Sequence, residues 1–294
     1  MVSKPKVAIV CDWLTNMGGA ERVILELHRM YPDAPIYTST FESENMPLFK
    51  NAKVHTAWFQ KLPKKLRKHQ LLTIPRQWYF GHLKLRGFDV VISNSGAESK
   101  AVRVPDGIHI NMCNTPTLYY WIKPDEYLKN EGTGGLNWLW RAGLKLLLPY
   151  AKKWDLKASK RPDYMYAIST SVQDRIKKYY GRESDLLYPP TDIDRFKNDG
   201  TKERSGFVVF GRQVQHKRFD LSILACNEAQ VPLTVIGNGP EHQRLKAMAG
   251  STITFKSSVS DSEMVNYISR AEAFIFPNEE DFGIVSPEAQ AAGI

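Results

Sequence analysis

Residues 274–293 read FIFPNEEDFGIVSPEAQAAG, and this stretch decides how the rest of the chain is interpreted. The apolar residues 273–276 form a short run that ends at a proline, which is typical of a buried parallel strand. After an acidic loop, Ser286 is placed to cap a helix, with Pro287 at the first helical position and Gly293 at its end. This order of strand, loop and helix predicts one unit of a doubly wound α/β sheet.

Two glutamates of this stretch are candidates for ligand binding. Glu280 lies in the loop after the strand, and Glu288 lies in the first helical turn, eight positions later. In a doubly wound sheet both would lie at the crevice where ligands bind. Their carboxylates can accept hydrogen bonds from sugar hydroxyls, and the amides of Gly283, Ile284 and Val285 can bind further oxygens or a phosphate. The alternative is an acidic loop followed by an ordinary capped helix.

A second candidate element follows the apolar strand 207–210. It begins with Gly211 and Arg212 and reaches Lys217 five residues later, and Gly237 marks a similar turn after the next strand. Two fixed cations can stabilise negative charge that grows on a bound ligand. A basic loop at the head of a helix is the alternative interpretation.

These two elements resemble the retaining GT-B glycosyltransferases of family-4 type, also called glycosyl transferases group 1, which include mannosyltransferases. The run from Glu280 to Gly293 is similar to their E-x7-E signature, and residues 211–217 are similar to their Gly-Arg-x4-Lys element. The resemblance implies two facing Rossmann-like domains. It also implies that Glu280 approaches the donor sugar and that Glu288 binds the nucleotide ribose.

The same resemblance implies roles for further residues. Arg212 and Lys217 would hold the donor diphosphate and act in catalysis together with Glu280. A larger set would line the donor, and it consists of Gly18, Gly19, Gly211, Gly237, Phe282, Gly283, Ile284, Val285 and Glu288. The family's reaction uses no metal, so we expect neither a metal nor a cofactor. The substrate would be a GDP- or UDP-linked sugar.

Gly18 and Gly19 lie between the apolar strand 7–10 and a predicted amphipathic helix. Their spacing fits neither the G-x-G-x-x-G fingerprint nor a P-loop, so an ATP or dinucleotide site is disfavoured. They resemble the glycine-rich first loop of the family, which lies across the cleft from the donor. A tight turn that requires positive φ would explain the two glycines equally well.

Length and composition indicate two domains. The 294 residues are 43% apolar, and the excess of 40 basic over 31 acidic residues gives a net charge of +9, which favours acidic partners. We place an acceptor-side domain at 1–196, a polar linker at 197–205 and a nucleotide-sugar-binding domain at 206–294. Because family members continue past the Glu288 helix, we expect the second domain to be incomplete.

The first domain shows short strands alternating with helical patterns, which predicts a parallel sheet. Its expected strands are 7–10, 35–40, 53–58, 88–93, 108–113 and 164–169. The three cysteines, Cys11, Cys113 and Cys226, have no metal-like spacing and fit a reducing compartment. No signal peptide and no apolar run of about 18 residues is found. We therefore expect a cytoplasmic protein, free or peripheral on the inner face of the cytoplasmic membrane.

Two stretches of the first domain combine basic and large apolar residues. Residues 61–86 contain no acidic residue, and residues 136–154 mix leucines and aromatics with lysines and arginine. Either stretch could lie on an anionic membrane, and the first could equally bind nucleic acid. A solvated basic face for the first stretch and a core helix for the second are the alternatives.

Asn114 follows the strand 108–113 and begins a loop that resembles the family's His-Thr-Pro-x-Arg-Tyr loop. Asn114 takes the place of the His, and Leu118 takes the place of the Arg. An asparagine can hydrogen-bond a sugar or acceptor group but carries no titrating proton. His109, on the strand itself, is interpreted as structural.

Taken together, these patterns favour a retaining hexosyltransferase. It would move mannose or a similar sugar to a lipid-linked or cell-envelope glycan acceptor, and nucleic acid is not an expected partner. Two alternatives remain: a nucleotide-sugar 2-epimerase on the same scaffold, and a non-catalytic basic protein that binds membrane or RNA.

Overall fold

The computed structural model describes residues 4–67, 72–122, 124, 137–196, 200 and 203–294. The chain forms two compact units, Met1–Pro190 and Thr191–Ile294. Their boundary precedes the expected linker because Phe196 is completely buried in the core of the second unit. Part of that linker, 197–199 and 201–202, lies outside the described residues.

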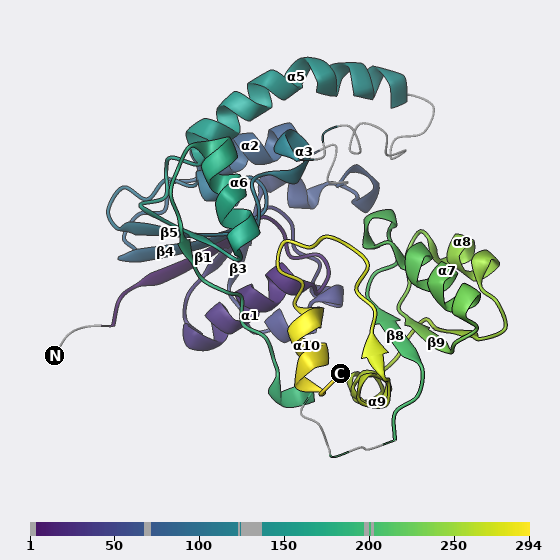
Figure 1. Cartoon of the computed structure of the whole chain (residues 1–294). Helices are drawn as coiled ribbons and strands as arrows, with labels where there is room; N and C mark the ends of the chain where they lie inside the picture. The colour runs from purple at the N-terminus through teal and green to yellow at the C-terminus, as the bar shows by residue number, and fades with distance from the viewer. Residues whose placement is uncertain (1–3, 68–71, 123, 125–136, 197–199, 201–202) are drawn as a thin grey trace. The chain divides into compact units, whose positions relative to one another are not determined.

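The described part of the first unit contains one parallel sheet (Figure 1). Its strands are β1 Val7–Cys11, β2 Ile36–Thr38, β3 Val54–Thr56, β4 Val90–Ser95, β5 Ile108–Cys113, β6 Tyr164–Ala167 and β7 Asp185–Leu186. They are ordered β3-β2-β1-β4-β5-β6-β7, and every neighbouring pair is parallel. The predicted parallel sheet is thus confirmed, with β7 as an additional strand at its edge.

Helices cover both faces of this sheet. They are α1 Gly19–Met30, α2 Thr73–His82, α3 Leu118–Trp121, α5 Asn137–Ala158 and α6 Thr170–Tyr180. On one face Ile9 packs with Ile24 of α1, and on the other Val10 packs with Phe80 of α2 and Ala158 of α5. Alternate residues of β1 thereby reach opposite layers, as the period of a strand requires.

The second unit repeats this plan on a smaller scale. Its strands β8 Phe207–Phe210, β9 Leu233–Ile236, β10 Ile253–Lys256 and β11 Ala273–Phe274 form a parallel sheet in the order β10-β9-β8-β11. Its helices are α7 Phe219–Ala229, α8 His242–Met248, α9 Asp261–Ser269 and α10 Val285–Ala291. Val208 packs with Ile268 of α9 on one face, while Val209 packs with Ile223 of α7 on the other.

Serine side chains cap two of the helices, but the cap predicted at Ser286 is not formed. The Ser169 hydroxyl accepts from the Val172 amide at the start of α6, and Ser260 forms a capping box with Glu263 at the start of α9. Ser286, however, does not cap α10. That helix already begins at Val285, and the Ser286 hydroxyl accepts a hydrogen bond from Gln290 within it.

The helical start at Val285 is compatible with the proline that follows it. Pro287 becomes the third helical residue, which still lies in the first turn where backbone N–H groups have no intrahelical partner. Gly293 adopts φ 81° just beyond the helix and ends it in the left-handed conformation, as expected. The strand before this loop is shorter than predicted, because only Ala273 and Phe274 pair with β8.

Within the described residues, no group of three or more His, Cys, Asp or Glu side chains is placed to hold a metal ion. No helix in the described ranges is both long and apolar enough to cross a membrane. All three cysteines are free and buried.

Buried ion pairs fix the loops at the carboxyl end of the first sheet. Arg76 Nε of α2 lies 2.8 Å from Glu98 Oε2, and Lys100 Nζ lies 2.7 Å from Asp155 Oδ1 of α5. All four side chains are essentially inaccessible to solvent. Burial opposes the charged forms, but the partner carboxylates outweigh it and raise the pKa of both Arg76 and Lys100. Arg76 is therefore not part of a solvated basic face.

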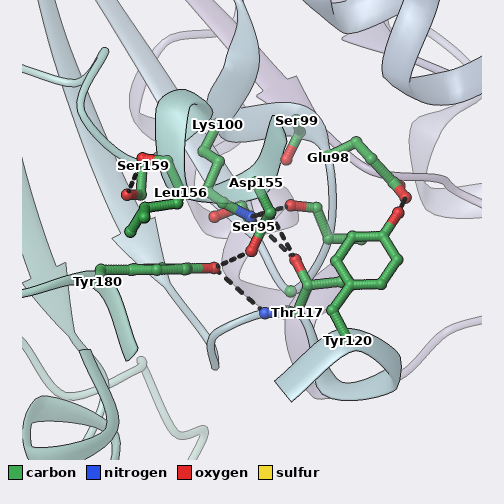
Figure 2. Close-up of polar contacts among 12 residues, drawn as sticks. Ser95, Glu98, Ser99, Lys100, Thr117, Tyr120, Asp155, Leu156, Ser159 and Tyr180 are labelled. Carbon is green, nitrogen blue, oxygen red and sulfur yellow. Dashed lines mark hydrogen bonds and ion pairs between the residues drawn. The ribbon is translucent and has the colours of Figure 1, made fainter. Parts of the chain in front are cut away.

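Neutral donors complete the shell around Asp155 (Figure 2). Its carboxylate accepts hydrogen bonds from the Thr117 hydroxyl at 2.9 Å, the Trp121 indole at 2.8 Å and the Tyr180 hydroxyl at 2.8 Å. A buried charge is tolerated when it is both paired and hydrogen-bonded, and Asp155 meets both conditions. The network joins the loop after β5 to α5 and α6.

Glu98 is surrounded in the same way by the two tyrosines of α3. The Tyr119 hydroxyl donates to Glu98 Oε1 at 2.5 Å, and the Tyr120 hydroxyl lies 3.2 Å from the same oxygen. Arg76 also donates to the Tyr119 oxygen at 3.1 Å. The Glu98 carboxylate, in the loop after β4, thus binds residues of both α2 and α3.

We predict that Lys100→Met destabilises the first unit by about 3–5 kcal/mol, because it leaves the Asp155 charge buried without its cation. Urea unfolding followed by tryptophan fluorescence measures this unit, since all seven tryptophans lie between residues 13 and 154. Lys177→Met is the matched control, because Lys177 pairs with Glu183 on the surface and should change stability very little. Equal losses in the two variants would contradict the prediction.

Candidate functional site

The candidate site lies in the second unit, where the strand order changes direction. β9, the next strand in the chain, lies on one side of β8, and β11 lies on the other side. In open α/β sheets, ligands bind outside the carboxyl ends of strands at such a switch point. The loops after β8 and β11 are the two segments that the sequence singled out.

Lys217 and Glu280 form an ion pair across this switch point. Lys217 ends the 3-10 helix Gln215–Lys217 after β8, and Glu280 lies in the loop after β11. Each side chain is 23% exposed, so the pair is accessible from solvent. Asn278 Nδ2 donates to Glu280 Oε1 at 2.9 Å and helps to orient the carboxylate. Two residues predicted separately from the sequence are therefore brought into contact.

Glu288 occupies the first turn of α10 and is almost completely buried. Its Oε1 lies 3.5 Å from Nη2 of Arg195, which belongs to the 3-10 helix Asp194–Phe196 at the start of the same unit. Glu288, which was predicted to bind the ribose, is thus paired with Arg195, a residue that the sequence did not identify. A separation of 93 residues gives no local signal for such a pair.

Arg212 is exposed and lies in the same loop as Lys217. Its carbonyl oxygen accepts a hydrogen bond from the Val214 amide at 2.9 Å, which tightens the loop. A cation on this loop would be available to an anionic ligand at the carboxyl end of β8.

Several positions of this site need glycine, because the backbone there has positive φ or because other atoms lie too close for a Cβ. Gly211 has φ 139° and Gly237 has φ 120°, and a Cβ on Gly237 would lie 2.1 Å from the Gly211 carbonyl oxygen. Gly283 has φ 75°, and a Cβ there would lie 2.8 Å from the ring of Phe276. Any larger residue at Gly237 would separate the loops after β8 and β9.

The remaining residues of the predicted donor-binding set lead into α10. Phe282 is half-buried, Ile284 is the residue that precedes the helix, and Val285 packs against the core of the unit. Because Val285 is the first helical residue, its N–H has no partner one turn earlier within α10.

The glycine pair of the first unit does not form a positive-φ turn. Gly18 has φ −142°, and a Cβ there would lie 2.9 Å from Glu21 Oε2, so the space is taken by a carboxylate. Burial, with a contribution from Asp12, raises the pKa of Glu21 to about 7. Gly19 is the first residue of α1 and is exposed. The positive-φ alternative is therefore wrong, and the nearest neighbour of a Cβ at Gly18 would be the end of a flexible side chain.

Asn114 lies at the carboxyl end of β5 and pairs with Asn94 at the corresponding end of β4. The two side-chain amides exchange hydrogen bonds, at 2.7 Å from Asn114 Nδ2 to Asn94 Oδ1 and 3.3 Å in the other direction. The amide of Asn114 is half-buried and fixed in orientation. His109 is buried in the sheet beside the Ser93 hydroxyl at 2.8 Å, and burial lowers its pKa to about 4, which suits a structural role.

Asp12 is a further residue that sequence inspection missed. It follows β1, is buried, and accepts hydrogen bonds from three backbone amides after β4. These donors are the N–H groups of Gly96, Ala97 and Ser99, at 2.8, 2.9 and 2.7 Å. Burial raises the pKa of Asp12, while the amide donors oppose that shift. An acidic residue directly after the first strand was the only sequence signal.

Residues 190–294 match the family model described as "Glycosyl transferases group 1". The match covers the second unit and therefore both loops of the candidate site. No curated protein matches the chain at a significant level.

Solved structures resemble nearly the whole chain at low identity. HepE of Anabaena, in complex with UDP and glucose, is 15% identical with a TM-score of 0.63, over 98% of this chain and 79% of that one. A mutant of TarM from S. aureus, in complex with fondaparinux, α-GlcNAc-glycerol and UDP, is 9% identical with a TM-score of 0.63, over 98% and 84%. A structure described as a UDP-N-acetylglucosamine 2-epimerase from Listeria monocytogenes is 9% identical with a TM-score of 0.52, over 99% and 78%.

At these identities the likeness is one of fold. The two parallel sheets, the helices on both faces of each and the likeness to these structures establish that the chain has the α/β fold of GT-B glycosyltransferases.

Proposed function

We propose that the protein is a retaining glycosyltransferase that takes a hexose from a nucleoside diphosphate sugar, GDP- or UDP-linked. The observation that carries this proposal is the accessible ion pair between Lys217 and Glu280 at the switch point of the second sheet. It lies within the residues that match the family model. A cation and a carboxylate at one crevice suit a ligand that carries both a diphosphate and a sugar.

In the proposed complex, the donor diphosphate replaces Glu280 as the partner of Lys217. Arg212, on the same loop, supplies a second cation. As the sugar leaves, negative charge grows on the diphosphate, and cations held in place by the fold stabilise that charge most in the transition state. The reaction proposed here needs no metal ion.

Release from Lys217 leaves the Glu280 carboxylate available to accept hydrogen bonds from sugar hydroxyls. Asn278 holds that carboxylate during the exchange. Glu288, held by Arg195, is the proposed partner of the ribose hydroxyls. The amides at the start of α10 and the glycine turns at Gly211 and Gly237 allow the ligand to approach the backbone closely.

The proposed acceptor is a lipid-linked or cell-envelope glycan, bound on the side of the first unit. Asn114, with its fixed amide, is the proposed contact to a sugar or acceptor hydroxyl. The structures of HepE with UDP and glucose and of TarM with UDP and α-GlcNAc-glycerol support a nucleotide-linked donor and a glycosylated product. Mannose is the donor sugar that the sequence resemblance favours.

Exposed apolar residues support a peripheral contact with an anionic membrane. Ile74 and Trp78 lie one turn apart on α2, and Leu146 and Tyr150 lie one turn apart on α5, all of them exposed. Lys153 of α5 continues the same stripe as an exposed cation. Each basic residue near anionic headgroups contributes about 1 kcal/mol, so these helices could dock reversibly. Residues 68–71 of the first predicted stretch and residue 136 of the second lie outside the described residues.

A 2-epimerase acting on a nucleotide sugar is the second candidate, because a structure described as such shares the fold. It would use the same diphosphate site but would return an epimerised nucleotide sugar without any acceptor.

We predict that one nucleotide family, GDP or UDP, stabilises the protein against heat and that Lys217→Ala removes the effect. Ligand at about 100 times its Kd should add about 2.7 kcal/mol of stability. Scanning calorimetry is the method here, because the second unit contains no tryptophan and its unfolding would not be followed by tryptophan fluorescence. Lys246→Ala, an exposed lysine of α8, is the control and should keep the shift. Stabilisation that survives in Lys217→Ala would contradict the proposed site.

We predict that Glu280→Gln lowers the rate of sugar transfer about 10- to 100-fold while nucleotide binding persists, because the neutral amide replaces charge-assisted hydrogen bonds to the sugar that are worth about 1.5–3 kcal/mol. Transfer is measured by chromatography of a radiolabelled nucleotide sugar incubated with a polyprenyl-linked acceptor. Glu279→Gln is the matched control, since Glu279 is the exposed neighbouring carboxylate. An epimerised nucleotide sugar formed without acceptor would instead identify the 2-epimerase.

We predict that the protein sediments with vesicles that contain phosphatidylglycerol and not with pure phosphatidylcholine, because binding needs anionic headgroups. Trp78→Ala and Leu146→Ala should each weaken sedimentation. Leu224→Ala, an exposed leucine of α7, should leave it unchanged. Equal binding to both vesicle types would rule out the anionic contact.

A further inference from the structure

Gln213 is bound at all of its polar groups to one segment, the turn from Gly237 to His242. Its backbone N–H donates to the Asn238 carbonyl at 2.9 Å, and its carbonyl accepts from the Glu241 amide at 3.1 Å. Its side-chain Nε2 donates to the Gly237 carbonyl at 2.8 Å, and Oε1 lies 2.7 Å from His242 Nδ1. Gln213 is also completely buried.

The hydrogen-bond partners fix both the amide and the imidazole. Because Nε2 of Gln213 donates to a carbonyl oxygen, Oε1 must be the atom that faces His242. An amide oxygen can only accept, so Nδ1 of His242 carries the hydrogen. The His242 ring also packs perpendicular to the ring of Phe255, at 5.6 Å between centroids and 87° between planes. The imidazole is therefore held on two sides.

The backbones of the two loops are in direct contact around Gln213. A Cβ on Gly237 would lie 2.1 Å from the Gly211 carbonyl oxygen, and a Cβ on Gly239 would lie 2.3 Å from the Gln213 carbonyl oxygen. Gln213 thus stands between Arg212 and Lys217 as the fixed point of a loop whose neighbouring residues are exposed or half-buried.

We infer that Gln213 and His242 are positioning residues for donor binding, which hold Arg212 and Lys217 where a nucleoside diphosphate can meet both. This inference rests on the proposed function. Neither side chain needs to touch the ligand. A buried amide that loses one hydrogen bond is costly, so removal of the His242 donor would loosen the loop. A displacement of about 1 Å in a positioning group is enough to weaken its effect strongly.

The test uses the whole chain and titration calorimetry with UDP and with GDP. His242→Ala should raise the Kd of the bound nucleotide about tenfold, whereas His242→Asn should restore it to within about threefold, because the Asn Nδ2 can replace the Nδ1–H donor. Gln213→Glu keeps the acceptor for His242 but loses the donor to Gly237, so it should weaken binding as well.

Asn227→Ala is the matched control in the same unit. Asn227 also joins two segments, by donating to the Met248 carbonyl at 2.8 Å and accepting from the Gly250 amide at 2.9 Å. Its loss should lower thermal stability without changing the Kd. Equal weakening in His242→Ala and Asn227→Ala would overturn the inference, because general destabilisation would then explain both.

The remaining outcomes separate this inference from the proposed function. Weak binding in both His242→Ala and His242→Asn would mean that the imidazole contacts the ligand itself, which overturns a positioning role. Unchanged binding in His242→Ala overturns it too. If the wild-type chain binds neither UDP nor GDP, the proposed function fails and the inference fails with it.

Discussion

The parallel strand order shared by the two sheets is the constraint on which the rest of the molecule depends. In each unit the first strand has the second on one side and the fourth on the other, so the chain leaves the carboxyl ends of the first and fourth strands in opposite directions. An opening between two loops follows from this order alone. What the chain places in that opening differs between the units.

In the first unit a buried carboxylate occupies this opening, whereas in the second unit an accessible ion pair occupies it. Asp12 accepts three backbone hydrogen bonds across the gap between β1 and β4, and it is buried. In the second unit Lys217 and Glu280 meet at the corresponding place, between β8 and β11, with both side chains accessible. A ligand can reach and replace either partner of the accessible pair, whereas in the first unit it would have to displace a buried carboxylate that accepts three hydrogen bonds. This difference favours the second unit as the site of anion binding.

Periodic and local features of this fold could be predicted from sequence, and long-range polar contacts could not. Strand 108–113 and two helix caps depend only on residues close in sequence, so the sequence alone can indicate them. The two caps are those at Ser169 and Ser260. The spacing that singled out Lys217 and Glu280 is also local within each loop. Pairs such as Arg76 with Glu98, or Gln213 with His242, join segments 22 and 29 residues apart, and no single-sequence pattern encodes such a distance. Ser286 does not cap α10, because Ile284 already adopts helical angles and the helix begins before Ser286.

The three buried cysteines give each unit its own chemical reporter. Cys226 is the only thiol of the second unit, and burial raises its pKa, as it does for Cys11 in the first. A thiol reacts as the exposed thiolate, so alkylation must wait until the surrounding helix and sheet separate. The rate at which Cys226 is modified therefore measures how often the second unit opens, independently of Cys11 and Cys113.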